Sequence, residues 1–452
     1  MSTKLFLKAI ESVFDSKDIY INTIDKEPYS NDWSSIKGTE PVVVVFPRNK
    51  VQVHEVVKLC NKFSLEFIGS GGRTGLSGGA TPLNNEVIVS FDRMNKIIDY
   101  DEISKTVICE PGLVTKSLQD FANSQDLYYP IEFSSTGSSQ IGGNIATNAG
   151  GIRVLKYGLT GKYVQGIEVI SGDGDVLNFD KNIIKNATGP NLKNIFIGSE
   201  GIFGLFTSCR MQLINKPSET KVCILSFDDI NHYNLITNNI RKFDIEAIEF
   251  FTKECSEKVH ESFGNCNPVG ISKYYFIVEY SDINLEDILN KMIMSNVVSN
   301  AVISQNDNQK EEIWKNRMLI SESIYKMKPL KFDLAVPIHL YANLIQSIEN
   351  HFTDINTFIP VLFGHAGDGN LHANFIYNGL GKELKKNKRN LDIFIYKTII
   401  KHKGTISAEH GVGYLKKDLL KNYLPKKEID TIKSLKKNFD PKNLLNPKKL
   451  IS

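Results

Sequence analysis

The chain has 452 residues, of which 41% are apolar and 23% are charged, and its formal net charge is +3. This length exceeds what one hydrophobic core serves, so two or three domains are expected, with the composition of an ordinary globular protein. The small net charge argues against a nucleic-acid partner. The six cysteines form no C-x-x-C pair, which argues against iron–sulfur ligation and favours reduced thiols.

The N-terminal segment, residues 1–18, carries acidic residues early and lacks a long apolar core, which is unlike a targeting segment. We expect it to form an amphipathic helix. No stretch of the chain approaches the roughly 20 apolar residues that span a bilayer. We therefore expect a soluble, cytoplasmic protein.

Alternation of apolar runs and turn residues predicts a β-α-β unit near the N-terminus. Residues 41–46 read as a buried strand, 50–63 as an amphipathic helix and 66–68 as a second strand. Further short strands are predicted at 86–90, 106–109 and 166–170. Around residue 215 the sequence changes to strands and helices poor in glycine, and we place a domain boundary there.

The segment from Gly69 to Gly79 reads GSGGRTGLSGG, with six glycines in eleven residues. Glycine lets the backbone approach a ligand closely, and successive exposed amides make an anion nest suited to a diphosphate. A second segment, GSSQIGGNIATNAGG at 137–151, has five glycines. Two such loops predict one extended, phosphate-bearing cofactor that is held from two sides.

Familiar phosphate motifs do not describe the first loop. Thr74 stands where a G-x-G-x-x-G fingerprint needs its third glycine, and no G-K-[ST] follows. Residues 75–79 match the G-x-S-x-G nucleophile elbow, which requires a helix after the serine. Pro82 and a β-branched run follow instead, so a serine hydrolase is only a remote alternative.

Two histidines farther along the chain flank a predicted turn. His365 and His372 enclose AGDGN, which predicts a tight hairpin that brings the two imidazoles together. His372 and Asn374 are two residues apart, so in a strand they face the same way. Glu409 and His410 are adjacent and could serve different partners. Two histidines and a carboxylate suit a divalent cation with open coordination positions.

The order of these motifs resembles a known flavoprotein group. Six segments in the first half of the chain resemble the FAD-binding domain of vanillyl-alcohol oxidase relatives. They are PVVVVFPRNKVQVHEVV, GGRTGLSGGATP, EPG (110–112), GSSQIGGNIATNAGG, KYG (156–158) and GSEGIFG (198–204). Three later segments resemble the C-terminal domain of FAD-linked oxidases: GHAGDGNLH (364–372), AEHGVG (408–413) and FDPKNLLNP (439–447). Together they resemble the group of glycolate oxidase, D-lactate dehydrogenase and D-2-hydroxyglutarate dehydrogenase.

This resemblance implies an α+β fold with a two-part FAD-binding domain of the PCMH/vanillyl-alcohol oxidase type and an α+β cap domain. The FAD-binding domain would comprise residues 1–215, the cap 216–404, and residues 405–452 would return to the flavin domain. FAD would be non-covalent, because neither glycine loop contains His or Cys. The implied cofactor-binding residues are Gly71, Gly72, Arg73, Thr74, Gly75, Ser77, Glu110, Pro111, Gly112, Gly137, Ser138, Gly142, Gly143, Asn144, Thr147, Glu200 and Gly201.

The resemblance also implies roles in a substrate site. His365, His372 and Glu409 would bind zinc or manganese, and His410 would be the base. Arg317, Ser321 and Lys331 match positions that bind substrate carboxylates in D-2-hydroxyglutarate dehydrogenases, and Asn374 is assigned to the same site. Two alternatives stay open: Arg317 in a surface salt bridge on a helix at 310–326, and His410 as a group that holds Glu409.

The activity so implied is oxidation of a D-2-hydroxy acid of the D-lactate, D-2-hydroxyglutarate or glycolate class to its 2-oxo acid, by hydride transfer to flavin. A sugar or lactone oxidase of the same fold is the alternative. The electron acceptor would be a quinone, a cytochrome or an electron-transfer flavoprotein. The lysine-rich C-terminal stretch is either a solvated helix face or a contact with the inner-membrane surface, and a homodimer is left open.

Overall fold

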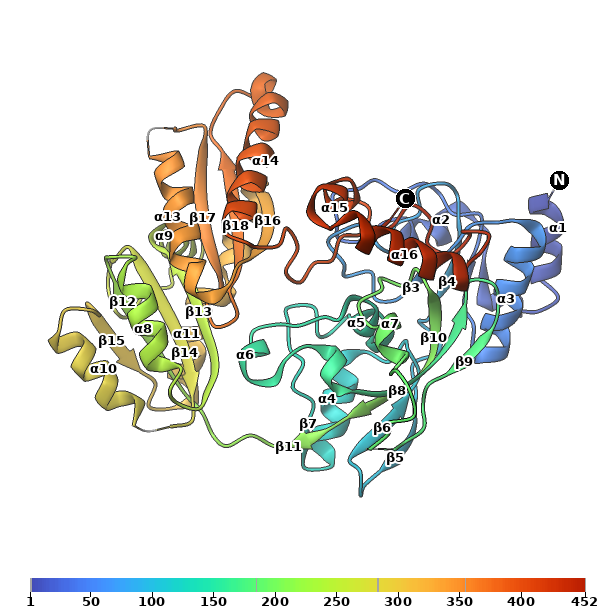
Figure 1. Cartoon of the computed structure of the whole chain (residues 1–452), viewed down its shortest axis with the longest axis horizontal. Coiled ribbons are helices and arrows are strands. Elements are labelled where there is room, and N and C mark those ends of the chain that lie inside the picture. The colour runs from blue at the N-terminus through green and yellow to red at the C-terminus, as the bar shows by residue number, and fades with distance from the viewer. Residues whose placement is uncertain (1, 184, 283, 354, 452) are drawn as a thin grey trace. The chain divides into compact units, whose positions relative to one another are not determined.

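The computed structural model describes residues 2–183, 185–282, 284–353 and 355–451, and it divides into two compact units (Figure 1). Unit 1 comprises Met1–Gly151, Leu159–Lys216 and Glu409–Ser452, and unit 2 comprises Ile152–Gly158 and Pro217–Ala408. Each unit combines helices with sheets, so the predicted α+β class is confirmed.

The N-terminal part of unit 1 contains the predicted β-α-β unit. Strands β2 (Val44–Val45) and β3 (Phe67–Ser70) both pair in parallel with β4 (Val87–Ser90), and α3 (Lys50–Phe63) connects β2 to β3. Helix α3 begins where predicted because Asn49 caps it, its side chain accepting a hydrogen bond from the Gln52 amide. The remaining elements of this part are α1 (Ser2–Ile10), β1 (Ile19–Tyr20) and α2 (Thr23–Lys26).

A five-stranded antiparallel sheet forms the second part of unit 1. Its strands, in the order β5-β6-β10-β8-β9, are β5 (Ile97–Asp101), β6 (Thr106–Cys109), β10 (Gly204–Gln212), β8 (Val164–Ser171) and β9 (Val176–Asn178). Around it lie α4 (Thr115–Ser124), α5 (Ile141–Thr147), α7 (Lys193–Phe196) and the pair β7 (Leu127–Tyr128) and β11 (Ile214–Asn215). The second glycine-rich segment, residues 137–151, therefore contains helix α5, with non-helical residues before and after it.

The C-terminal segment packs within unit 1. It contains α15 (Lys417–Tyr423) and α16 (Lys426–Phe439), and it then runs beside β3. The Phe67 amide donates to the Leu444 carbonyl at 2.8 Å, and the Asn446 amide donates to the Phe67 carbonyl at 2.8 Å. Buried Lys436 donates to Asp440 at 2.6 Å, which fixes the turn that follows α16.

Unit 2 is built on a seven-stranded antiparallel sheet. The strand order is β15-β12-β14-β13-β17-β18-β16, with β15 (Asn300–Ile303), β12 (Lys221–Phe227), β14 (Tyr274–Tyr280), β13 (Ile245–Thr252), β17 (Phe358–His365), β18 (Asn370–Tyr377) and β16 (Leu330–Ala335). The predicted hairpin is confirmed, because β17 ends at His365 and β18 begins at Asn370.

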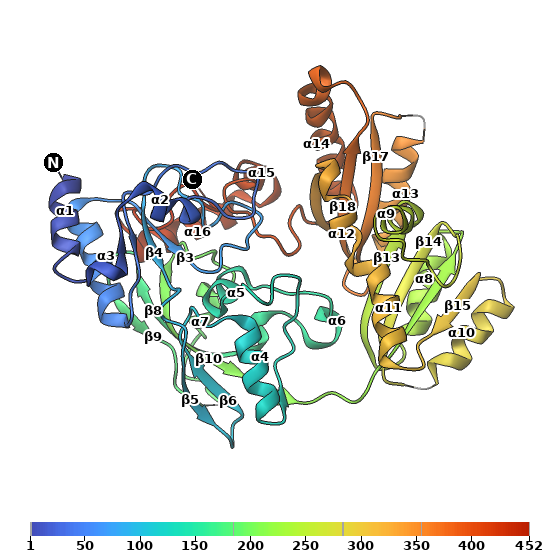
Figure 2. The same ribbon diagram turned by 180° about the vertical axis from the view of Figure 1, so that it is seen from behind.

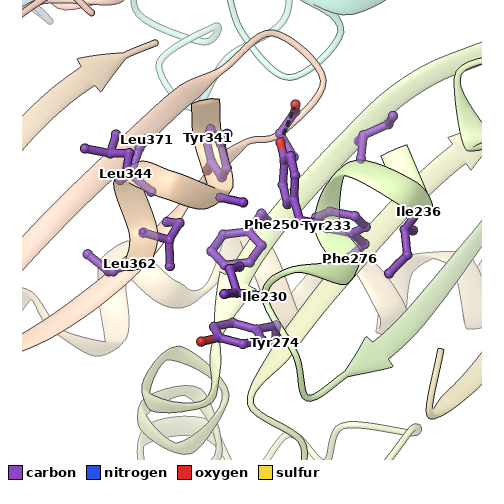
Figure 3. Close-up of a cluster of buried hydrophobic side chains, with 14 of the residues drawn as sticks. Ile230, Tyr233, Ile236, Phe250, Tyr274, Phe276, Tyr341, Leu344, Leu362 and Leu371 are labelled. Atoms are coloured by element: carbon purple, nitrogen blue, oxygen red, sulfur yellow. Dashed lines mark hydrogen bonds between the residues drawn. The ribbon is translucent and has the colours of Figure 1, made fainter. Parts of the chain in front are cut away.

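Helices cover both faces of this sheet. The larger core lies beneath α8 (His232–Ile240), α10 (Leu285–Met294), α13 (Tyr341–Phe352) and α14 (Leu384–Lys401), and it includes the stacked pair Tyr233 and Tyr341 with Phe250 (Figure 3). Helices α9 (Lys253–Phe263), α11 (Asp307–Met318) and α12 (Ile320–Ser323) cover the opposite core, to which Phe251 belongs (Figure 2). Successive strand residues therefore serve opposite faces.

Two local features differ from what the sequence indicated. The helix predicted at 310–326 is interrupted at Leu319, so α11 ends at Met318 and Ser321 lies on the separate helix α12. The short helix α6 (Val154–Tyr157) packs with unit 2, where Arg153 pairs with Glu279 and Lys156 pairs with Glu246. Among the helices of the described residues, none combines the length and apolarity needed to cross a membrane.

Candidate functional site

A cavity of about 300 Å³ lies inside unit 1 between the two glycine-rich segments. Residues of the first loop, from Gly69 to Ala80, and of the second, from Ser139 to Gly150, contribute to its walls. Both segments therefore border the same cavity. Its apolar lining includes five side chains that lie outside the quoted motifs: Trp33, Phe91, Phe133, Leu205 and Phe206.

The two loops touch each other at Gly72. A Cβ atom at this position would lie 2.1 Å from the Ser138 carbonyl oxygen and 3.1 Å from the Ser139 Cα. Any side chain at residue 72 would therefore push the loops apart. This close approach is the physical reason for glycine at this point of the cavity wall.

Arg73 stabilises the first loop through its own side chain. Its Nη1 donates to the Gly71 carbonyl at 2.9 Å, and its guanidinium lies over the Tyr29 ring, with the Cζ atom 4.4 Å from the ring centroid. Nη2 is 3.4 Å from a carboxylate oxygen of Asp92. Asp92 also accepts a hydrogen bond from the Gln140 side chain at 2.7 Å, so one carboxylate joins both loops.

Most of the predicted cofactor-binding residues line the cavity. They are Gly71, Gly72, Arg73, Thr74, Gly75, Ser77, Pro111, Gly142, Gly143, Asn144, Thr147, Glu200 and Gly201. Four others, all within the described part of the chain, lie outside the lining: Glu110, Gly112, Gly137 and Ser138. Two of these have evident packing roles, since Glu110 accepts from the Lys96 amide at 2.9 Å and a Cβ at Gly112 would lie 1.9 Å from the Phe91 carbonyl oxygen.

The segment with Glu409 and His410 contributes to the same cavity. Glu409 Oε1 lies 3.3 Å from His410 Nε2. The Ser77 hydroxyl donates to the His410 carbonyl at 2.7 Å, so the first glycine loop fixes the backbone that carries this imidazole. Glu200 accepts from the Val412 amide at 2.7 Å, and its burial raises the pKa of the carboxyl group.

Unit 2 gathers the other predicted site residues on one face of its sheet. Asp333 lies opposite His372, and Lys331 lies opposite Asn374, in the β16–β18 pair. Residues directly opposite each other in antiparallel strands point to the same face. The Lys331 side chain is exposed, yet partial desolvation lowers the pKa of its ammonium group. The Asn374 amide is buried and donates to the His372 carbonyl at 3.1 Å.

The two histidines of the hairpin meet through their Nε2 atoms, which are 3.3 Å apart. Tetrahedral zinc with Zn–N bonds of about 2.0–2.1 Å places two ligand nitrogens about 3.3–3.4 Å from each other. The spacing of the pair is compatible with a shared divalent cation, and it is also the distance of a hydrogen bond between the two imidazoles. Glu409, the third predicted ligand, belongs to unit 1, whereas His365 and His372 belong to unit 2.

A carboxylate lies on the Nδ1 side of each imidazole. His365 Nδ1 is 2.6 Å from Glu249 Oε1, and His372 Nδ1 is 3.8 Å from Asp333 Oδ1. An ionised carboxylate only accepts, so His365 donates its Nδ1–H to Glu249 and keeps a lone pair on Nε2. Such carboxylates orient metal-binding histidines in many proteins.

Arg317 is buried in α11, with 7% of its surface exposed. Its Nε atom lies 2.7 Å from Glu249 Oε2, and its Cζ atom lies 4.6 Å from the centre of the Phe363 ring. The alternative of an exposed surface salt bridge is therefore wrong for Arg317. Ser321 is exposed on α12.

Comparisons with known proteins find FAD-linked enzymes that are similar to this chain over its whole length. The family model of the FAD binding domain matches residues 41–180, and the model of the FAD linked oxidases' C-terminal domain matches 216–450. The D-2-hydroxyglutarate dehydrogenase of Stutzerimonas stutzeri (strain A1501) is 35% identical over 466 aligned residues that cover 100% of both chains. The mitochondrial D-2-hydroxyglutarate dehydrogenase of Bos taurus is 30% identical, covering 98% of this chain and 83% of that protein.

Solved structures with low sequence identity share the fold. The structure of p-cresol methylhydroxylase with substrate bound has a TM-score of 0.76 at 15% identity, and it covers 99% of this chain and 96% of that one. The 4-ethylphenol oxidase from Gulosibacter chungangensis has a TM-score of 0.73 at 16% identity, with 99% and 97% covered. These neighbours confirm the predicted fold type.

Proposed function

Because the chain belongs to the FAD-linked oxidases and is an FAD-dependent 2-hydroxy acid dehydrogenase, we propose that its substrate is a D-2-hydroxy dicarboxylate, D-2-hydroxyglutarate. The observation that supports this choice is that two cationic side chains lie on the side of the sheet that carries the histidine pair. Arg317 packs on Phe363, whose ring lies 5.3 Å from that of His372, and Lys331 is two residues from Asp333, the cross-strand neighbour of His372. A monocarboxylate such as lactate needs only one cation.

We assign the cavity of unit 1 to FAD. The backbone of the two glycine loops would hold the pyrophosphate, and the aromatic and aliphatic side chains of the lining would pack against its rings. FAD supplies the hydride acceptor when it is bound. Residues 1–215 and 405–452 would form the FAD-binding domain, and 216–404 the substrate domain.

The chain's own residues would then bind the substrate and move one proton. His365 and His372 would hold a zinc or manganese ion together with Glu409, and this ion would lower the pKa of the substrate hydroxyl. A ring nitrogen of His410 would take the hydroxyl proton, because imidazole accepts a proton near neutral pH. Arg317, Ser321, Lys331 and Asn374 would bind the substrate carboxylates, with the arginine fork suited to a bidentate contact.

The remaining assignments concern partners and compartment. An electron acceptor, whether quinone, cytochrome or electron-transfer flavoprotein, would reoxidise the flavin, and no nucleic acid takes part. We place the protein in the cytoplasm, with peripheral contact at the inner membrane as the alternative. Its oligomeric state is either a monomer or a homodimer. The relatives include bacterial proteins and proteins named as mitochondrial.

Anaerobic flavin reduction tests the proposed substrate. The purified protein is mixed with D-2-hydroxyglutarate, L-2-hydroxyglutarate, D-lactate, glycolate or a sugar lactone, and bleaching of the flavin absorbance is followed. We expect D-2-hydroxyglutarate to bleach the flavin at lower concentration than the monocarboxylates, and the L-enantiomer to leave it oxidised. Bleaching by D-lactate but not by D-2-hydroxyglutarate would refute the dicarboxylate, and bleaching by a sugar lactone alone would favour the sugar or lactone oxidase.

A further inference from the structure

Glu249 lies at the centre of strand β13, and its side chain has no exposed surface. It contacts two residues of the proposed site through different oxygens. Oε1 is 2.6 Å from His365 Nδ1, and Oε2 is 2.7 Å from Arg317 Nε. We propose that Glu249 is a positioning residue that orients the metal-binding imidazole and the carboxylate-binding guanidinium together. This inference rests on the proposed function.

The position of Glu249 in the sheet makes it suited to that task. Glu249 is the direct cross-strand partner of His365 in the β13–β17 pair, and β13 is an interior strand between β14 and β17. The carboxylate is therefore attached to a rigid interior strand, which fixes both its position on the sheet face and its orientation. A buried carboxylate is strongly unfavourable unless it is paired, so its contacts with His365 and Arg317 also hold it in place.

The contact with His365 decides which nitrogen faces the metal. Because the carboxylate accepts the Nδ1–H, the lone pair of His365 is on Nε2, 3.3 Å from His372 Nε2. Without this partner the ring would be able to rotate or to change tautomer, and the spacing of the two donor nitrogens would no longer be set.

The contact with Arg317 holds the guanidinium beside the same carboxylate. Arg317 Nε lies 2.7 Å from Glu249 Oε2 as an ion pair, without the angle of a hydrogen bond, and the Arg317 Cζ atom lies 4.6 Å from the centre of the Phe363 ring. Glu249 thus couples the two ends of the substrate site, which lie on residues 48 positions apart in the chain (317 and 365).

The isosteric change Glu249→Gln disturbs at least one of these two contacts. An amide has one acceptor oxygen and one donor nitrogen, so it accepts from His365 only by turning its NH₂ group toward the Arg317 guanidinium. In the opposite orientation it loses His365. Glu249→Asp keeps the charge but is one methylene shorter. Glu246→Gln is the matched control, because Glu246 lies on the same strand, is 2% exposed and pairs with Lys156 instead.

The test measures zinc binding and kinetics on the full-length, FAD-loaded protein. Metal is removed with a chelator, and Zn²⁺ is titrated back against a chromophoric competitor, with Co²⁺ absorption as a spectroscopic check of the ligand geometry. We expect Glu249→Gln to weaken Zn²⁺ binding about 10–100-fold and to raise KM for D-2-hydroxyglutarate. Glu249→Asp should recover part of the Zn²⁺ affinity, and Glu246→Gln should bind Zn²⁺ as the wild type does.

Two results would overturn the inference: Zn²⁺ affinity unchanged in Glu249→Gln, or an equal loss in Glu246→Gln, which would show a general effect of disturbing β13. If Glu249→Gln does not fold, as judged by circular dichroism and thermal denaturation, Glu249→Asp against Glu246→Gln provides the same comparison. A wild type that D-2-hydroxyglutarate does not reduce, but whose Zn²⁺ affinity falls in the Glu249 variants alone, would refute the proposed substrate and support the role of Glu249.

Discussion

Replacement of Gly72 by alanine should loosen the cavity of unit 1 by separating its two loops. The new Cβ would lie 2.1 Å from the Ser138 carbonyl oxygen, whereas such atoms ordinarily stay more than 3 Å apart, so one loop must move by about 1 Å. Overpacking of this kind costs about 1–3 kcal/mol. If the whole cost falls on the FAD-bound form, the Kd for FAD rises about 5- to 150-fold.

Gly143→Ala is the informative companion. A Cβ at Gly143 meets no protein atom within 4 Å, and the residue lies in α5 and lines the cavity. The apoprotein should therefore keep its stability or gain slightly, because alanine favours the helix. FAD binding should weaken nonetheless, since the methyl group enters the space assigned to the cofactor.

Titration of apoprotein with FAD, followed by flavin fluorescence quenching, measures both Kd values, and urea denaturation of the apoprotein measures stability. Gly381→Ala, at a surface position of unit 2 with no protein atom within 4 Å of its Cβ, is the control. Wild-type affinity for FAD in both Gly72→Ala and Gly143→Ala would refute the assignment of this cavity to FAD.

Three further outcomes are expected from unit 2. His365→Ala should abolish stoichiometric Zn²⁺ binding but leave FAD content unchanged, which metal analysis and absorbance of one sample would show. Arg317→Lys keeps a charge beside Glu249 but loses the planar fork, so kcat/KM for D-2-hydroxyglutarate should fall about 10- to 150-fold and fall less for D-lactate; equal losses would contradict a dicarboxylate site. Desolvation lowers the pKa of Lys331, so its positive charge is present below that pKa and is lost at lower pH than in an ordinary lysine. The KM for D-2-hydroxyglutarate should therefore rise as the pH becomes alkaline. The variant Lys331→Gln should flatten that rise.

Local patterns in the sequence predicted the regular elements well. Helix α3 spans the predicted residues 50–63 because a capping asparagine precedes an amphipathic stretch, and β6 spans the predicted 106–109. The hairpin that joins the two histidines followed from its turn residues alone. These features depend on neighbours within a few positions, which a single sequence displays.

Long-range contacts were beyond such patterns. Glu249 is 116 residues from His365 in the chain, and no motif marks it as part of a site. Ser77 and Glu200 were predicted to bind the cofactor, but their side chains also hold the backbone that follows Glu409, more than 200 residues away from either. Contacts of this kind arise from the register of strands and the return of the C-terminal segment, which periodicity does not encode.

A single-turnover reduction under anaerobic conditions tests whether the chain oxidises D-2-hydroxyglutarate through its bound flavin. The FAD-loaded protein is titrated with D-2-hydroxyglutarate while flavin absorbance and the 2-oxo acid are measured together. We expect one equivalent of substrate to reduce one equivalent of flavin and to yield one equivalent of 2-oxo acid. A flavin that stays oxidised with every D-2-hydroxy acid, or a chain that takes up no FAD at all, would contradict it.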